Sequence, residues 1–282
     1  MIAVVYSGSR YAFWKLEDKG LIIADFKTQG INPFFNDEKF ISQLLNKNTD
    51  LINYAEKIKR IYFFGAGASS KARKEIVCNA FNKFFKFGKV TIEHDLLAAA
   101  IATCEHEKGI VGIIGSGSNA AYYSGKKIKE NNYGLGYILG DEGSSSWMSL
   151  QIIKGYLTGN LPDNIQEGFK RKYDLDRKTI LEKFYKKPFP TLFLTPFADF
   201  IRENKNEKYI QSLVNRGFNE YFQKYIIPLK KHYPNVPIHM VGAIAAEFQS
   251  NLLHIATTHD IQLSNIVKEP IYNLLNYYSN KN

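Results

Sequence analysis

The chain has 282 residues, of which 45% are hydrophobic and 23% are charged, a composition typical of a globular protein with an ample core. The formal net charge is +10, but the basic residues form short separate clusters such as Lys126-Lys127, which favours a solvated surface over a nucleic-acid partner. The chain has only two cysteines, without CxxC spacing, which excludes a cysteine-rich metal centre within one chain. No apolar run reaches the roughly 18 residues that span a membrane, so we expect a cytoplasmic protein without a membrane partner.

Three strands joined by short turns are expected at the start of the chain. They are predicted at residues 2–5, 12–16 and 21–26. The first turn contains Ser7-Gly8-Ser9, and a glycine there leaves backbone amides open to a phosphate group. The next segment, 28–33, is predicted to be a loop, because Pro33 biases Asn32 away from the helical conformation.

Helices and strands are expected to alternate over residues 37–104. Helices are predicted at 38–46, 50–59, 71–85 and 96–104, and strands at 61–64 and 90–94. Asp37 is expected to cap the first of these helices. The glycine turn 65–70 follows a strand and opens a helix, but Ser70 breaks the dinucleotide-binding fingerprint. We therefore favour a tight turn whose backbone lines a cleft.

Asp95 stands between the strand 90–94 and the helix 96–104, and two roles fit this place. As the N-cap of the helix it would contribute roughly 1 kcal/mol of stability. The end of a strand is equally where active-site groups collect in α/β folds. The residue type and the position do not decide between the two roles.

A glycine-rich turn follows the apolar strand predicted at 110–114. Its sequence, Gly115-Ser-Gly-Ser-Asn119, can present bare amides to a ligand. Residues 115–120 fit the dinucleotide fingerprint GxGxxA, but that motif must open a helix, whereas residues 122–128 predict a hairpin. A Walker loop is excluded, because no Lys-Ser/Thr pair follows the glycines. A phosphate loop and a glycine turn without a ligand remain as alternatives.

Two carboxylates stand between glycines shortly afterwards, in Gly140-Asp-Glu-Gly143. Ionised carboxylates accept hydrogen bonds from hydroxyl groups, so Asp141 and Glu142 are candidate contacts for a polyol. Combined with the turn 115–119, they suggest transfer between a phosphate donor and a polyol.

The rest of the chain is predicted to be mainly helical. Helices are expected at 147–158, 164–173, 177–184, 192–202, 209–228, 244–257 and 270–278, with a break at 187–190. One strand is expected at 237–241, and it turns into the following helix through Gly242-Ala243.

Several of these features match known motifs along essentially the whole chain. Residues 115–119 read GSGSN, residues 136–144 read GYILGDEGS, and residues 28–33 fit TxGxNP. The strand-turn-strand over residues 2–16, Asp95 and the pair Gly242-Ala243 complete the set. In these motifs the sequence resembles the N-acetylglucosamine kinase branch of the actin-like ATPase superfamily, whose members have a BadF/BadG-type ATPase domain. The pair GSGSN and GDEGS at this spacing is specific, whereas each alone would be weak.

The resemblance implies an α/β fold with two ribonuclease-H-like lobes around a central cleft. The N-terminal lobe would cover residues 1–107 with the C-terminal helix 268–282, and the C-terminal lobe would cover residues 108–267. ATP and Mg²⁺ are the implied cofactors, an amino sugar is the implied substrate with N-acetylglucosamine first, and Asp95 is the implied catalytic base. The implied contacts to ATP are Gly8, Ser9, Arg10, Gly115, Ser116, Gly117, Ser118, Gly242 and Ala243. The implied contacts to the sugar are Asn32, Gly65, Ala66, Asn119, Asp141 and Glu142.

The first loop departs from the family pattern Asp-x-Gly-x-Thr. Tyr6 replaces the acidic residue that helps to hold hydrated magnesium, and Arg10 replaces the threonine that contacts phosphate. No residue is therefore assigned to the metal, and a homodimer stays open. Two functions remain: an ATP-dependent amino-sugar kinase, and a non-catalytic sensor or scaffold that binds sugar or nucleotide. The retained Asp95 and GDEG sequence favour the kinase.

Overall fold

The computed structural model describes residues 1–129, 133–186 and 190–280, and contacts within the chain divide it into two compact units. Unit 1 consists of Met1–Val111, Tyr123–Lys129 and Glu269–Asn282, and unit 2 consists of Gly112–Tyr122 and Glu130–Lys268. The predicted break at 187–190 lies for the most part outside the described residues. None of the helices in the described ranges combines the length and the apolar character needed to cross a membrane.

The sheet of unit 1 has the strand order β3-β2-β1-β4-β5. Its strands are β1 (Ile2–Ser7), β2 (Tyr11–Asp18), β3 (Leu21–Gln29), β4 (Arg60–Gly65) and β5 (Lys89–His94). The first three strands form the predicted antiparallel meander, and β4 and β5 continue the sheet parallel to β1. The register pairs Ser7 with Gly65 and Gly65 with His94. These three residues therefore form one row at the carboxyl ends of the parallel strands.

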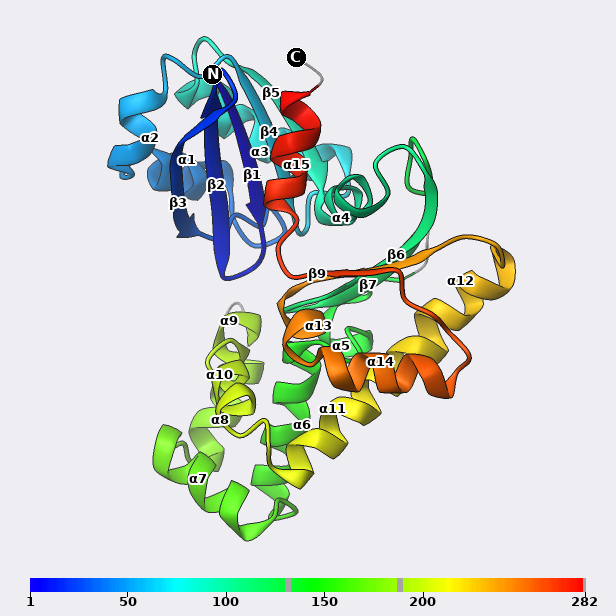
Figure 1. Ribbon diagram of the computed structural model, residues 1–282. Coiled ribbons are helices and arrows are strands. Elements are labelled where there is room, and N and C mark those ends of the chain that lie inside the picture. The colour runs from blue at the N-terminus through cyan, green and yellow to red at the C-terminus, as the bar shows by residue number, and fades with distance from the viewer. Residues whose placement is uncertain (130–132, 187–189, 281–282) are drawn as a thin grey trace. The chain divides into compact units, whose positions relative to one another are not determined.

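Helices cover both faces of this sheet. They are α1 (Glu38–Asn46), α2 (Thr49–Tyr54), α3 (Lys71–Phe84), α4 (Asp95–Cys104) and α15 (Ile271–Ser279). Because side chains alternate along a strand, Ala3 and Val5 pack against α1, α2 and α3, while Ile2 and Val4 pack against α4 and α15. Figure 1 shows α4 and α15 on the same face of the sheet. The central strands β1 and β4 are thus mostly buried between helices, so their ends are where they can carry a site, whereas β3 is largely exposed.

Local signals explain the helix ends of unit 1. The Asp37 carboxylate accepts a hydrogen bond from Phe40 N (2.7 Å), which confirms the predicted cap of α1. Helix α2 ends at Tyr54, before the predicted residue 59. The helix cannot continue to residue 59, because Lys59 N donates to Met1 O (3.0 Å) and the chain there already leads into β4.

The second sheet has the order β7-β6-β8-β9. Its strands are β6 (Lys108–Ile114), β7 (Ser118–Ser124), β8 (Ile238–Val241) and β9 (Asn265–Val267), and β8 is parallel to β9. The strand β9 was not predicted, since three residues are too few to show an alternating pattern. The turn Gly115–Gly117 joins β6 to β7, so a strand follows the glycines where the dinucleotide fingerprint requires a helix.

The helices of unit 2 differ from the prediction where proline intervenes. They are α5 (Gly136–Leu139), α6 (Ser145–Thr158), α7 (Asp163–Tyr173), α8 (Arg177–Tyr185), α9 (Pro190–Leu194), α10 (Phe197–Glu203), α11 (Lys208–Tyr221), η1 (Phe222–Ile226), α12 (Ile227–His232), α13 (Ala243–Glu247) and α14 (Gln249–Thr258). The helix expected at 192–202 is divided at Pro196, which precedes α10 and cannot donate to α9. The helix expected at 209–228 contains the π-helix η1 just before Pro228 and continues to His232.

Candidate functional site

The predicted site residues of unit 1 gather at the carboxyl ends of β1, β4 and β5. The Ser7 hydroxyl accepts a hydrogen bond from Ile31 N (2.8 Å), and the Ser7 carbonyl accepts one from Ala66 N (3.0 Å). These two bonds connect the first turn with the loops 28–33 and 65–67. Asp95 follows directly after β5 at the same edge. The structure therefore brings together Gly8, Ser9, Arg10, Asn32, Gly65, Ala66 and Asp95.

Gly30 lets the loop 28–33 pack directly on the first turn. A Cβ atom at Gly30 would lie 2.7 Å from Ser9 O and would also collide with Gly8 O. Gly30 N donates to Arg10 O (3.0 Å), and Gly8 N donates to Tyr11 O (3.0 Å). Any larger residue at position 30 would separate the candidate phosphate turn from the candidate sugar loop.

The Asn32 side chain is almost completely buried, with 8% of its surface exposed. Its Oδ1 atom accepts a hydrogen bond from Phe34 N (2.9 Å), and Asn32 N donates to Asn36 Oδ1 (2.8 Å). The side-chain oxygen is therefore engaged within the loop. The Nδ2 amide is the group that a substrate hydroxyl would meet.

His94, and not Asp95, caps α4, which corrects the N-cap interpretation of Asp95. His94 Nδ1 accepts a hydrogen bond from Leu97 N (3.2 Å), and Asp95 is the first residue of the helix. An imidazole can accept through Nδ1 only in its neutral form with the proton on Nε2. Burial lowers the pKa of His94, which favours that neutral form. The carboxylate of Asp95 is thus not needed as a cap.

The Asp95 carboxyl is held at the first turn of α4 in a poorly hydrated environment. Its Oδ1 atom accepts a hydrogen bond from Leu96 N (2.9 Å). Burial raises the pKa of Asp95, while the neighbouring His94 and the backbone amides oppose that rise. A carboxylate with a raised pKa is a stronger base, and a perturbed pKa at a strand end is typical of catalytic groups.

Tyr6 lies close to Asp95, and sequence reasoning gave no indication of this. Its ring packs on the face of the sheet that α4 and α15 cover. Burial and the carboxylates of Asp95 and Glu269 raise the pKa of Tyr6 far above its usual range, so the phenol is neutral. Arg10 is exposed at the other end of this turn, with its guanidinium 5.2 Å from the centre of the Tyr11 ring.

The remaining predicted residues belong to unit 2, where the turn 115–118 is fixed by backbone hydrogen bonds. Gly115 N donates to Gly117 O (2.9 Å), Ser145 N donates to Gly115 O (3.0 Å) and Ser146 N donates to Ser116 O (3.2 Å). The first turn of α6 thus holds the loop by its carbonyl groups. Ser116 is exposed, and a Cβ atom at Gly115 would meet no atom within 4 Å, so this backbone borders open space.

Asp141 braces the phosphate-loop candidate. Its Oδ1 atom accepts a hydrogen bond from Ser118 N (3.0 Å). A Cβ atom at Gly117 would lie 3.0 Å from both carboxylate oxygens, so glycine is what allows this close approach. Asp141 also has a φ of 59°, a left-handed conformation that non-glycine residues seldom adopt. Strain of this kind often accompanies functional positions.

Glu142 is held by two residues that are distant in the sequence. Lys224 Nζ lies 2.6 Å from Glu142 Oε1, and the Tyr225 hydroxyl donates to Oε2. Burial opposes ionisation, but these two hydrogen bonds outweigh it and keep the pKa of Glu142 below its usual value. Both oxygens are therefore used within the protein, which supports a bracing role for Glu142. Lys224 and Tyr225 lie on η1, and no sequence signal connected them with the site.

Asn119 and the turn after β8 complete the group in unit 2. Asn119 Oδ1 accepts a hydrogen bond from Ala120 N (2.8 Å), and Asn119 O accepts one from the Tyr221 hydroxyl (2.9 Å). Gly242 N donates to Val267 O (2.9 Å), and the Gly242 backbone lies against Ile114 at the end of β6. Gly242-Ala243 therefore adjoins the turn 115–118, as an adenosine-binding turn would have to do.

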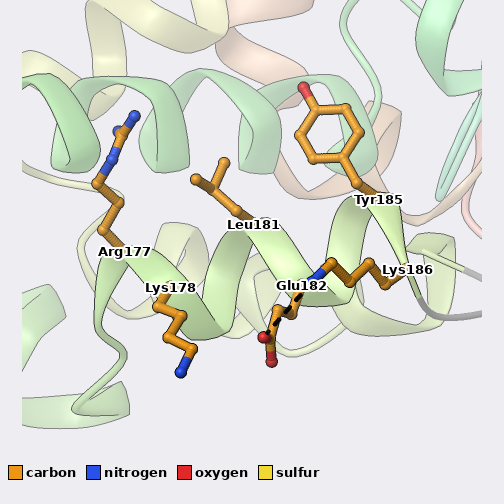
Figure 2. Close-up of a pocket in the computed structure, with 6 residues that line it drawn as sticks. All are labelled: Arg177, Lys178, Leu181, Glu182, Tyr185 and Lys186. Carbon is orange, nitrogen blue, oxygen red and sulfur yellow. Dashed lines mark ion pairs between the residues drawn. The ribbon is translucent and has the colours of Figure 1, made fainter.

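Two surface concavities lie elsewhere on the chain. One of about 550 Å³ is lined only by residues of α8 and its end: Arg177, Lys178, Leu181, Glu182, Tyr185 and Lys186. Figure 2 shows these side chains along a single helix, with the ion pair between Lys186 and Glu182 drawn as a dashed line. A second, of about 490 Å³, follows α3 and is lined by Ser69, Lys71, Lys74, Glu75, Cys78 and Ile92. Neither contains a residue predicted to bind substrate or cofactor.

The residues present suit ATP better than they suit a protein-held metal. The backbone of Gly115 borders open space, and a Cβ atom at Gly8 would meet only Tyr11 O within 4 Å, at 3.8 Å, so neither turn is obstructed where it would receive phosphate. Within residues 1–129, 133–186 and 190–280, no group of three or more His, Cys, Asp or Glu side chains could hold a metal ion. Mg²⁺ in kinases is commonly bound by one or two carboxylates together with substrate phosphates, so such a group is not required.

Comparison with solved structures identifies the fold. A protein from Porphyromonas gingivalis, described as a "putative N-acetylglucosamine kinase", is 31% identical with a TM-score of 0.91, and the match covers 99% of each chain. A protein of the same description from Chromobacterium violaceum is 13% identical with a TM-score of 0.72, over 98% of this chain and 99% of that one. A ROK family glucokinase from Streptomyces griseus, solved with glucose and AMPPNP, is 11% identical with a TM-score of 0.56, over 95% and 93%.

These likenesses confirm the predicted fold class. The chain has the two-sheet α/β architecture of the actin-like ATPases. The Chromobacterium and Streptomyces proteins support the fold alone, whereas the Porphyromonas protein is a relative along the full length. No family model matches the chain, and no curated protein sequence does.

Proposed function

Because this chain belongs to the family of sugar kinases that includes the Porphyromonas gingivalis protein, we propose that it transfers the terminal phosphoryl group of ATP to an amino sugar. N-acetylglucosamine is the first candidate substrate. The motifs GSGSN and GDEGS support a place in the BadF/BadG-type branch of these proteins.

The observation that carries the proposal is the position of Asp95. It directly follows His94, the last residue of β5, which stands in the row that contains Ser7 and Gly65, and its pKa is raised by burial. Asp95 would accept a hydrogen bond from the attacking hydroxyl of the sugar and then take its proton. In phosphoryl transfer the transition state is loose, so orienting the hydroxyl matters more than the strength of the base.

The other residues bind and orient. In unit 1, Asn32, Gly65 and Ala66 would contact the sugar from the loops beside Asp95. In unit 2, Asn119 and Asp141 are the candidate sugar contacts. In unit 1, Ser9 N and the Arg10 side chain are the candidate contacts to the phosphates of ATP. In unit 2, Ser116 N and Gly117 N are the candidate phosphate contacts, and Gly242-Ala243 would contact adenosine. Gly8, Gly115 and Ser118 would shape the two turns, because their amides already donate to Tyr11 O, Gly117 O and Asp141 Oδ1. Glu142 would act through Lys224 and Tyr225, keeping the GDEG turn in place.

ATP supplies the phosphoryl group, and Mg²⁺ would accompany its phosphates without an assigned protein ligand. Tyr6 cannot take the place of a carboxylate, because its phenol stays neutral. Arg10 is always charged and could approach the phosphates directly. The same two substitutions support the second candidate function, a sensor or scaffold that binds sugar or nucleotide without catalysis.

A combined binding and turnover measurement separates the two candidates. ADP release is followed with N-acetylglucosamine, N-acetylgalactosamine, glucosamine and glucose, each with ATP and with or without Mg²⁺. In parallel, thermal shifts are recorded with each sugar and with AMPPNP. Release of ADP that requires an amino sugar supports the kinase. Thermal stabilisation by a sugar without any ADP release would refute the kinase and support the sensor.

A further inference from the structure

One side of α11 and its continuation η1 contacts both turns that carry candidate sugar residues in unit 2. Gly217, Tyr221 and Tyr225 follow one another at intervals of four residues, so they lie on the same side of the helix. All three are buried, and we call them the tyrosine face. This face is therefore packed against other elements of the unit along its whole length.

The glycines of the GDEG turn stand where the tyrosine face approaches. A Cβ atom at Gly143 would lie 3.0 Å from Gly217 O, and one at Gly140 would lie 3.0 Å from the Tyr225 hydroxyl oxygen. Close packing against the helix therefore explains both glycines of this sequence without a ligand. What the turn offers to a ligand is the pair of residues between the glycines.

The Tyr225 hydroxyl fixes the backbone of Asp141. A backbone hydrogen bond from Asp141 reaches this hydroxyl, which itself donates to Glu142 Oε2. Asp141 has a φ of 59°, a conformation that is unfavourable for a residue with a side chain and that persists only where its surroundings hold it. Tyr225 therefore determines where the Asp141 carboxylate, a candidate sugar contact, stands.

The Tyr221 hydroxyl holds the other candidate sugar contact of unit 2. It donates to Asn119 O (2.9 Å), and the Tyr221 side chain is completely buried. A Cβ atom at Gly112 would collide with this hydroxyl, so β6 has a glycine at the point where the hydroxyl enters. Without the hydroxyl, the carbonyl of Asn119 would lose this donor. The separation of Asn119 and Asp141 thus depends on two hydroxyl groups of one helix.

We propose that Tyr221 and Tyr225 are positioning residues for the sugar, and that the separation they impose on Asn119 and Asp141 makes the site select an acetamido sugar over glucose. This inference rests on the proposed function, because it takes Asn119 and Asp141 as sugar contacts. Two polar groups at a fixed separation match one arrangement of hydroxyl and acetamido groups, and they reject a sugar that leaves one of them without a partner. Groups placed by a packed helix keep that separation constant.

The first test compares the parent with Tyr225→Phe and Tyr221→Phe. By calorimetry, the affinity for N-acetylglucosamine should fall about tenfold in each variant, and the affinity for glucose should fall less, because glucose lacks the acetamido group. The affinity for AMPPNP should stay within about twofold of the parent. In turnover with ATP, KM for N-acetylglucosamine should rise about tenfold and kcat should change less than about threefold, because the lost contacts act alike on the ground and transition states.

Tyr173→Phe is the matched control. The Tyr173 hydroxyl donates to Pro196 O (2.8 Å), so the substitution removes a bond from a phenol to a backbone carbonyl in the same unit, and the ring packs on Phe197, outside both turns. This variant should bind N-acetylglucosamine as the parent does. An equal loss of affinity in the control, or equal losses for N-acetylglucosamine and AMPPNP in the tyrosine-face variants, would show a general loss of structure and overturn the proposal.

A double variant tests whether Tyr225 acts through Asp141. Asp141→Asn removes the proposed sugar contact, so adding Tyr225→Phe should cost less than about twofold of further affinity for N-acetylglucosamine. Two losses that multiply in full would show that the residues act independently and would refute the positioning role. If Tyr225→Phe does not fold, Tyr221→Phe carries the test alone.

The two proposals fail in different ways. If the parent selects N-acetylglucosamine, the tyrosine-face variants lose this selectivity and no ADP is released, the kinase is refuted and the positioning role stands. If N-acetylglucosamine is phosphorylated and both variants bind it as tightly as the parent, the kinase stands and the positioning role is refuted. A parent that binds no amino sugar refutes both.

Discussion

Replacing Asp95 by asparagine tests the centre of the proposed mechanism. Asparagine keeps the shape of the side chain and an Oδ1 atom that can accept from Leu96 N, but it cannot take a proton. Because His94 supplies the cap of α4, the substitution leaves the helix start intact. We expect kcat to fall by roughly a hundredfold or more, which corresponds to about 2.7 kcal/mol of transition-state stabilisation.

The same substitution is expected to raise stability at pH 7. The pKa of Asp95 is raised in the folded chain, whereas an unfolded aspartate has a pKa of about 3.9. Between these two values folding takes up a proton, so the parent loses stability as the pH rises through that window. Each tenfold difference in acidity between the folded and unfolded states corresponds to about 1.4 kcal/mol. Asparagine removes this cost, and the gain should vanish once the pH falls below about 3.9.

Two measurements check this reasoning. Steady-state ADP release with N-acetylglucosamine gives kcat, and urea unfolding at pH 7 and at pH 3.5 gives the free energy of unfolding for parent and variant. The expected result is a folded, stabilised and nearly inactive Asp95→Asn protein. A folded variant that turns over at the parental rate would remove Asp95 from the mechanism. A variant that is less stable at pH 7 would show that the carboxylate is favourably solvated or paired.

Three further tests address the neighbouring groups: His94, Asp141, and the pair Tyr6 and Arg10. His94→Ala should lower the free energy of unfolding by about 1 kcal/mol and reduce kcat, because Asp95 would be misplaced. His94→Asn should restore both quantities, since asparagine also caps helices, and an unchanged stability in His94→Ala would rule out the cap. Asp141→Asn keeps an acceptor for Ser118 N, so the turn should stay in place. By calorimetry the affinity for the sugar should fall about tenfold while the affinity for AMPPNP stays unchanged, and equal losses of affinity for both ligands would exclude a sugar contact. The double variant Tyr6→Asp/Arg10→Thr should turn over faster than the parent, and its rate should depend more strongly on Mg²⁺ in a magnesium titration. If the parent turns over as fast as the double variant, the altered loop is neutral.

The sequence by itself determined the local features of this protein. Glycine and proline positions predicted the turns 7–10 and 28–33, short strand-like runs between turns predicted the meander β1–β3, and Asp37 predicted the start of α1. The spacing of GSGSN and GDEGS pointed to the fold that the solved structures confirm. These features could be predicted because each depends on the backbone preferences of a few neighbouring residues.

Prediction was weaker where a proline or a sheet decided the end of a helix. The break at Pro196 and the π-helix η1 before Pro228 interrupt stretches whose apolar pattern continues without a break. Helix α2 ends early because Lys59 N donates to the carbonyl of Met1, the residue before the central strand β1, which the helical pattern does not contain. Periodicity reports which residues are buried, but it does not report which backbone groups are already used by another element.

Tertiary structure alone decided what each candidate side chain contacts. The carboxylate of Glu142 is held by Lys224 and Tyr225, which are 82 and 83 residues away along the chain. The pKa of Asp95 is raised by burial, which the neighbouring residues in the sequence do not reveal. A site residue's chemistry depends on its neighbours in space, and a single sequence contains no record of which distant residues those will be.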